Sequence, residues 1–296
     1  MRANHSVQEP QGCPTYYLAA RVGALVIIAG LSQVHAAVGD ECRGPTDDCV
    51  AIGRWNFSVA LGAGVRSNPL VNGTDIPLVA IPQFNYYGKR FFIDNLDFGF
   101  TLAERGANTF NLIATPGYDR VFFYRTDLQN FFIGFPTNTP NPRPVRVSPG
   151  TPGATKVPPP APGITYLAGP EWTFKYSAVS GQLDLLRDAT GQNSGAEIRG
   201  ALGIPLLQST GTLSANIGFT WKSAATVNYY YRVPILYSGS AAFDPFIKLG
   251  YILPLSSKWR FNAFAEYERL GSGIADSPIV AEHSVATVFV GAIYTF

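Results

Sequence analysis

Four stretches of the chain alternate between apolar and polar residues with a period of two, which is the pattern of a β-strand with one apolar and one polar face. In residues 54–66, for example, Trp55 and Phe57 fall on one face and Asn56 falls on the other. The same alternation occurs in residues 212–222, 258–269 and 285–296. This pattern predicts antiparallel strands, either in a soluble sheet with one wet face or in a barrel that lies in lipid.

Three features of these strands favour the barrel in lipid. The strands are about 10 to 13 residues long, whereas soluble strands have about 5 or 6 and a tilted membrane strand needs about 9–11. The chain ends with Tyr294 and Phe296 on the apolar face, which is typical of outer-membrane barrels that the assembly machinery recognises. Aromatic residues also stand at the ends of the apolar stripes, where interfacial girdles belong: Trp55, Trp172, Trp221, Trp259, Tyr251, Tyr267 and Tyr294.

The strand count must be even, because both ends of such a barrel lie in the periplasm. If residues 90–104 bend near Asp94, the count is twelve; ten is the alternative if a short pair near 171–188 stays outside the membrane. The predicted strands are 54–66, 78–87, 89–94, 96–103, 107–115, 171–178, 181–188, 195–205, 211–222, 242–254, 258–269 and 284–296. We therefore predict an all-β fold, a transmembrane antiparallel β-barrel over residues 54–296, with short periplasmic turns and long external connections.

The amino-acid composition excludes several other classes of protein. The chain has 296 residues, of which 46% are hydrophobic and 14% are charged, against about 25% charged in typical soluble domains. The formal net charge of +2 excludes the basic footprint of a nucleic-acid-binding protein. The apolar run at residues 22–31 is half of the roughly 20 residues that a spanning helix needs.

That run has the features of a cleaved signal peptide. Arg21 precedes it, and Val34 and Ala36 follow it at the positions that small or aliphatic residues occupy before a cleavage site. We predict a signal peptide over residues 1–36 and a periplasmic lead-in over residues 37–53; a buried core segment is the alternative for the apolar run.

Two cysteines, Cys42 and Cys49, lie in the lead-in with six residues between them. In an oxidising compartment they are candidates for a disulfide, with two free thiols as the alternative. The sequence has no histidine beside them, and it predicts no metal site and no cofactor.

The connection 116–170 is unusually rich in proline. Residues 136–170 contain 11 of the 23 prolines, a composition that favours extended chain and cannot join a strand ladder. Segment 136–163 is predicted to be a surface loop, and an exposed recognition segment is the second interpretation.

Charged residues at inward positions predict a network across the lumen, because unpaired buried charge is costly. A narrow lumen crossed by ion pairs is favoured over a water-filled channel, for which twelve strands leave some room. The candidates are Arg54, Asp97, Lys175, Glu197, Arg199, Lys248, Arg260, Glu266 and Glu268, together with Arg66, Asp184 and Lys222.

The sequence offers no catalytic constellation. His283 is the one histidine outside the predicted signal peptide. Its neighbour Ser284 would point to the opposite face of a strand, so the two cannot form a nucleophile–base pair. We predict a protein that is not an enzyme.

Several motifs together resemble the MipA/OmpV family of outer-membrane proteins, named for the MltA-interacting protein. Residues 268–280 (ERLGSGIADSPIV) are similar to the late family segment, through Arg269, Leu270, Ala275, Asp276, Ser277 and Pro278. The turn 188–197, the stretch 64–90 and the final Tyr294-Thr295-Phe296 are also similar to family patterns. The resemblance covers residues 54–296 apart from 136–170.

This resemblance implies a monomeric barrel in the outer membrane of a Gram-negative bacterium. It also implies a scaffold that links a lytic transglycosylase to a murein synthase in the remodelling of peptidoglycan. The lead-in and the short turns would be the surface for these periplasmic partners. A small-solute pore or transporter is one alternative, and a surface adhesin that uses loop 116–170 is another.

Overall fold

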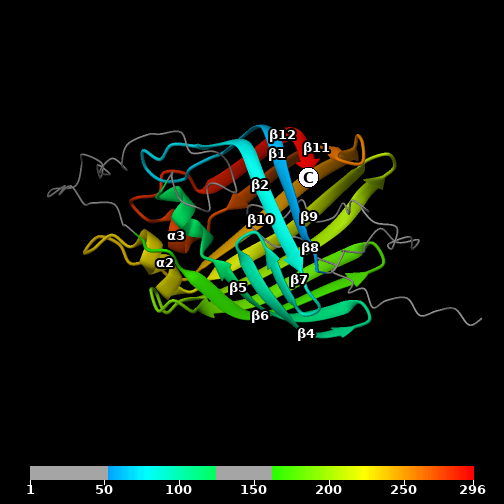
Figure 1. Cartoon of the computed structure of the whole chain (residues 1–296). Coiled ribbons are helices and arrows are strands. Elements are labelled where there is room, and N and C mark those ends of the chain that lie inside the picture. Colours follow the sequence, from blue (N-terminus) through cyan, green and yellow to red (C-terminus); the bar gives the residue numbers. More distant parts are fainter. Residues whose placement is uncertain (1–52, 125–161) are drawn as a thin grey trace, which may run out of the picture.

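The computed structural model describes residues 53–124 and 162–296, in which twelve strands form a closed antiparallel barrel (Figure 1). Each strand pairs with its neighbours in the chain, and β1 pairs with β12. The strands are β1 (Trp55–Arg66), β2 (Ile76–Tyr87), β3 (Phe91–Asp94), β4 (Asp97–Arg105), β5 (Asn108–Pro116), β6 (Tyr166–Tyr176), β7 (Val179–Asp188), β8 (Ala196–Gln208), β9 (Thr212–Lys222), β10 (Ala242–Pro254), β11 (Trp259–Arg269) and β12 (Ser284–Thr295). The predicted fold class and the count of twelve are confirmed. The predicted signal peptide, most of the lead-in, Cys42 and Cys49, and residues 136–161 lie outside the described residues.

The apolar stripes of the strands form the outer surface of the barrel. Phe57 and Leu61 on β1 are 51% and 50% exposed, and Val290 on β12 is 54% exposed. Because side chains alternate between the two faces of a strand, the polar residues between them point into the lumen. Among the described residues, no helix is both long enough and apolar enough to cross a bilayer.

Aromatic rings gather on the outer surface toward the periplasmic turns. Trp55 and Tyr86 have ring centroids 5.1 Å apart, and Trp259 and Tyr294 have centroids 4.9 Å apart. The terminal Phe296 joins this group, 5.1 Å from Tyr294 between ring centroids. Such rings mark the level of the lipid headgroups.

The predicted bend near Asp94 is a tight turn that separates β3 from β4. Asn95 adopts a left-handed conformation with φ 54°, and its side-chain oxygen accepts a hydrogen bond of 3.0 Å from the Phe84 amide. Asparagine tolerates this backbone region better than most residues. The turn divides residues 91–105 into two strands.

Because β3 is short, the pairing between β2 and β3 is the shortest ladder of the described barrel. Three residue pairs connect β2 to β3, whereas nine connect β1 to β12. Residues 76–83 of β2 therefore have a strand neighbour only on the β1 side among the described residues. Pro77 and Pro82 lie in this edge, where a residue without an amide N–H leaves no donor unpaired.

Strand β6 begins earlier than the sequence predicts, at Tyr166 instead of residue 171. Residues 166–170 pair with residues 112–116 of β5, so this ladder extends through Gly169 and Pro170. The long external connection accordingly runs from 117 to 165.

In the described parts of the external connections there are three helical elements: η2 (Tyr118–Phe122), α2 (Ala224–Tyr231) and α3 (Ser272–Ala275). Ser223 caps α2, since its Oγ accepts a hydrogen bond of 3.3 Å from the Thr226 amide. Figure 1 shows α2 and α3 at the same end of the barrel. We call these three elements the plug.

Candidate functional site

The plug closes the external end of the lumen with a hydrophobic cluster. Val227 and Tyr231 of α2 and Ile274 of α3 have no exposed surface, and Phe122 of η2 belongs to the same cluster. Phe289 supplies the barrel wall from β12 and is 1% exposed. This cluster is the larger core of the described residues, and it continues from the plug along the inner face of β1, β2 and β12 through Ala60, Ile81 and Ile293.

Hydrogen bonds tie the plug elements to one another and to the loops. The Ser277 hydroxyl donates to the Tyr231 carbonyl at 2.7 Å, and the Tyr237 hydroxyl donates to the Gly273 carbonyl at 2.8 Å. The hydroxyls of Thr165 and Tyr230 lie 2.8 Å apart. Burial raises the pKa of Tyr230 and Tyr231, so both phenols stay protonated at physiological pH.

Below the plug, one lysine joins three separate elements. Lys222 Nζ of β9 lies 2.7 Å from Asp119 Oδ1 of η2 and 3.1 Å from Asp244 Oδ2 of β10. The other oxygen of Asp244 accepts a hydrogen bond of 2.7 Å from the Gly271 amide at the start of the α3 segment. This cluster fixes η2 and the α3 segment to the barrel wall.

Three further cations in the lumen each lie against a carboxylate. Arg199 contacts Glu197 at 2.7 Å, and its guanidinium lies 5.3 Å from the Tyr118 ring centroid. The other two pairs have longer N···O distances: Lys248–Glu266 at 3.3 Å and Arg66–Glu268 at 3.6 Å. Because these side chains are almost fully buried, pairing offsets much of their cost of desolvation.

A second polar group lies on β5, β6 and β7. Glu171 and Asp184 are cross-strand neighbours, and Gln182 Nε2 donates to both of them at 2.7 Å and 2.8 Å. Asn111 Nδ2 donates to Glu171 at 2.6 Å. In this group, side-chain amides donate the hydrogen bonds that the Glu171 and Asp184 carboxylates accept.

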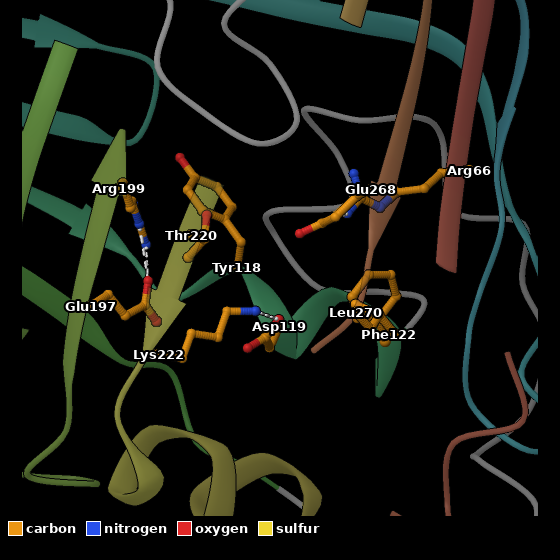
Figure 2. Close-up of a pocket in the computed structure, with 10 residues that line it drawn as sticks. All are labelled: Arg66, Tyr118, Asp119, Phe122, Glu197, Arg199, Thr220, Lys222, Glu268 and Leu270. Atoms are coloured by element: carbon orange, nitrogen blue, oxygen red, sulfur yellow. Dashed lines mark hydrogen bonds and ion pairs between the residues drawn. The ribbon is translucent and has the colours of Figure 1, made fainter. Parts of the chain in front are cut away.

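One cavity lies between the plug and the ion pairs of the lumen. Figure 2 shows the side chains that line it, among them Arg66, Tyr118, Asp119, Arg199 and Lys222, and its volume is about 10 Å³. A cavity of this size holds about one water molecule. The described side chains therefore fill most of the space around this cavity.

The structure brings five of the nine candidate lumen residues into buried ion pairs: Glu197, Arg199, Lys248, Glu266 and Glu268. Arg54 lies just before β1, exposed and outside the network. Asp97, Lys175 and Arg260 are half-buried; Arg260 donates to Thr295 Oγ1 at 3.3 Å, and Asp97 accepts from Tyr118 at 3.5 Å.

The family-motif segment belongs to the plug. Leu270, Ala275 and Ser277 are buried, Pro278 is half-buried, and Arg269 and Asp276 are exposed. Through Ser277 the motif holds the end of α2, so in this chain its geometry supports a structural role.

Sequence reasoning missed several residues of the site, above all Asp119, Glu171 and Asp244. Asp244 and Glu171 lie within strand stretches, so the alternation of the lumen face could have identified both. Asp119 lies in an external connection, where no periodic signal exists. The Ser223 cap was a local signal for helix α2.

The described residues contain neither a catalytic pair nor a group of metal ligands that can be recognised. His283 is exposed on the rim, and no hydrogen bond joins its ring to a described residue. No three His, Cys, Asp or Glu side chains come together as metal ligands in this part of the chain.

Comparison with known proteins gives one family match. The model of the family described as "MltA-interacting protein MipA" matches residues 61–296. No curated protein matches the chain.

Several solved barrels are similar in fold. OmpT, an outer membrane protein of Vibrio cholerae, is 12% identical, with 83% of this chain and 100% of that chain covered and a TM-score of 0.32. The NanC porin is 9% identical, with 81% and 99% covered and a TM-score of 0.38. An anion-selective porin from Comamonas acidovorans is 12% identical, with 82% and 99% covered and a TM-score of 0.32. At these identities and TM-scores, no function is transferred from these proteins.

Proposed function

The chain belongs to the MltA-interacting protein MipA family of outer-membrane proteins, and we propose that it is a non-enzymatic scaffold for peptidoglycan-remodelling enzymes. It would hold MltA, a lytic transglycosylase, and a murein synthase at the periplasmic face of the outer membrane. The family description supplies the first partner, and the resemblance of the motifs supplies the second.

The observation that carries this proposal is the packing of charged and apolar side chains in the external part of the lumen. A barrel that conducts solutes needs a continuous water-filled path. Here four buried cations lie against carboxylates, and the plug packs above them, leaving a cavity of about 10 Å³. Such an interior favours a function in which the protein binds partners on its surface. A periplasmic enzyme would contact the end of the barrel that carries the short turns.

Binding to MltA tests the scaffold directly. The mature barrel, purified in a zwitterionic detergent, should retain purified MltA in a pull-down, and the addition of the murein synthase should yield a ternary complex. The matched control is an unrelated outer-membrane barrel in the same detergent. Absence of MltA binding would contradict the proposed function.

Conductance tests the rival function. In a planar bilayer the folded barrel should give no discrete current steps, because the ion-pair network and the plug pack in the external part of the lumen. Regular steps of uniform size from heat-modifiable, folded protein would favour a small-solute pore instead.

A further inference from the structure

The two ends of the barrel differ in charge. The described loops of the external end carry four acidic residues (Asp75, Asp119, Asp276, Glu282) and two basic ones (Arg120, Arg232). The described periplasmic turns carry four basic residues (Arg54, Lys89, Arg90, Lys258) and no acidic one. Arg105, the last residue of β4, adds a fifth cation, and all five side chains are exposed.

The exposed cations of the described periplasmic end lie along seven neighbouring strands of the twelve, whereas Lys175, next to last in β6 on the remaining side, is half-buried. The five exposed cations flank β1, the β2–β3 turn, the end of β4 and the β10–β11 turn, which lie on one arc of the barrel because the strand order runs β10, β11, β12, β1, β2, β3, β4. We call this set the basic arc. The turns of the opposite arc, residues 177–178 and 209–211, carry no charged side chain.

Within the described residues, no carboxylate lies against the cations of the basic arc. The charged groups of Arg54, Lys89, Arg90 and Arg105 form no ion pair or hydrogen bond with a described residue, and Lys258 Nζ lies 5.6 Å from the Tyr294 ring centroid. Glu104 is the one acidic side chain within the same turns and strand ends. By contrast, four cations inside the lumen all lie against carboxylates.

The position of these cations relative to the membrane points to the periplasm. Arg54 precedes Trp55 and Lys258 precedes Trp259, so both stand on the periplasmic side of the aromatic girdle. Lipid surrounds a barrel on every side, so attraction to lipid headgroups alone would favour cations on both arcs. A one-sided arrangement fits a partner that docks on one side.

We propose that the basic arc is the docking surface for an acidic face of the periplasmic enzyme, which rests on the proposed scaffold function. Electrostatic complementarity of this kind orients the partner and speeds association. The chain's own lead-in is acidic, with Asp40, Glu41, Asp47 and Asp48 against Arg43. It would therefore repel the same partner face and is not the contact.

Charge reversal on the arc tests this proposal with MltA as the probe. In zwitterionic detergent, which contains no anionic lipid, the double variant Lys89→Glu/Arg90→Glu should weaken the binding of MltA by about tenfold or more at low salt. Binding to the unchanged barrel should fall as salt rises, and this dependence should flatten in the variant. The matched control, Arg232→Glu in the external loop between α2 and β10, should bind like the unchanged protein.

A second variant distinguishes binding by the basic arc from binding by the lead-in. Removal of residues 37–49 should leave binding unchanged or strengthen it, since the deleted segment carries the acidic side chains. Loss of binding on this deletion, or equal binding by the double variant and the unchanged barrel, would overturn the basic arc as the docking surface. If the unchanged barrel fails to bind MltA at all, the scaffold function itself fails.

Discussion

Inside the external half of the barrel, four buried cations lie within 3.6 Å of a carboxylate, whereas five exposed cations at the periplasmic end have no carboxylate against them in the described structure. The difference follows from the solvent. A buried charge needs an opposite charge or hydrogen-bond donors because desolvation is expensive, but water satisfies a charge on an exposed turn. Charge inside the external half therefore holds the structure together, and charge at the periplasmic end remains available to a partner.

Removal of the Lys222 charge should cause the largest loss of stability among the variants that compare the two ends. Lys222→Met leaves Asp119 and Asp244 buried without their cation, which should lower the free energy of unfolding by about 3–5 kcal/mol. Urea titration of the refolded barrel, followed by tryptophan fluorescence, measures the change. Lys89→Met, the same substitution on the basic arc, should leave the unfolding midpoint in place, and equal losses for both variants would refute the contrast between the two ends.

Truncation of an apolar side chain should likewise lower the stability of the protein more in the plug than in a periplasmic turn. Ile274 in α3 is fully buried, while Leu255 in the β10–β11 turn is 58% exposed. Ile274→Ala should cost about 2–4 kcal/mol through the cavity that it leaves, and Leu255→Ala should cost much less. If urea midpoints for the two alanine variants coincide, the plug does not contribute to the core of the folded barrel.

The smallest expected effect concerns the hydrogen bond that closes the plug. Ser277→Ala removes the donor to the Tyr231 carbonyl and should cost about 1–2 kcal/mol, because the buried carbonyl loses its partner. Ser257→Ala, in an exposed periplasmic turn, is the matched control. Hydrogen exchange of α2 amides should rise in the first variant alone; unchanged exchange there would show that Ser277 does not anchor the helix.

The barrel wall was predictable from the sequence, since lipid imposes alternation on every strand. Alternation identified four strands directly, and the requirement for an even number of strands led to the count of twelve and to the bend near Asp94. The prediction failed at Tyr166, because Gly169 and Pro170 read as a break although β5 pairs with them. The site was harder to predict from the sequence. Glu197 and Arg199 fall on the polar face of an alternating strand, but Asp119 contacts Lys222 only because η2 packs into the lumen. Such contacts between loops and lumen depend on tertiary placement, and no local period encodes them.

The short β3 has a consequence for the membrane around the barrel. β3 has four residues, whereas its partners β2 and β4 have twelve and nine, so the apolar wall is lower along β3 than beside it. A bilayer next to a short hydrophobic surface adapts by thinning. The lipid would accordingly be thinnest on the side of the barrel that also carries the basic arc, and an enzyme docked there would work beneath a local depression of the outer membrane.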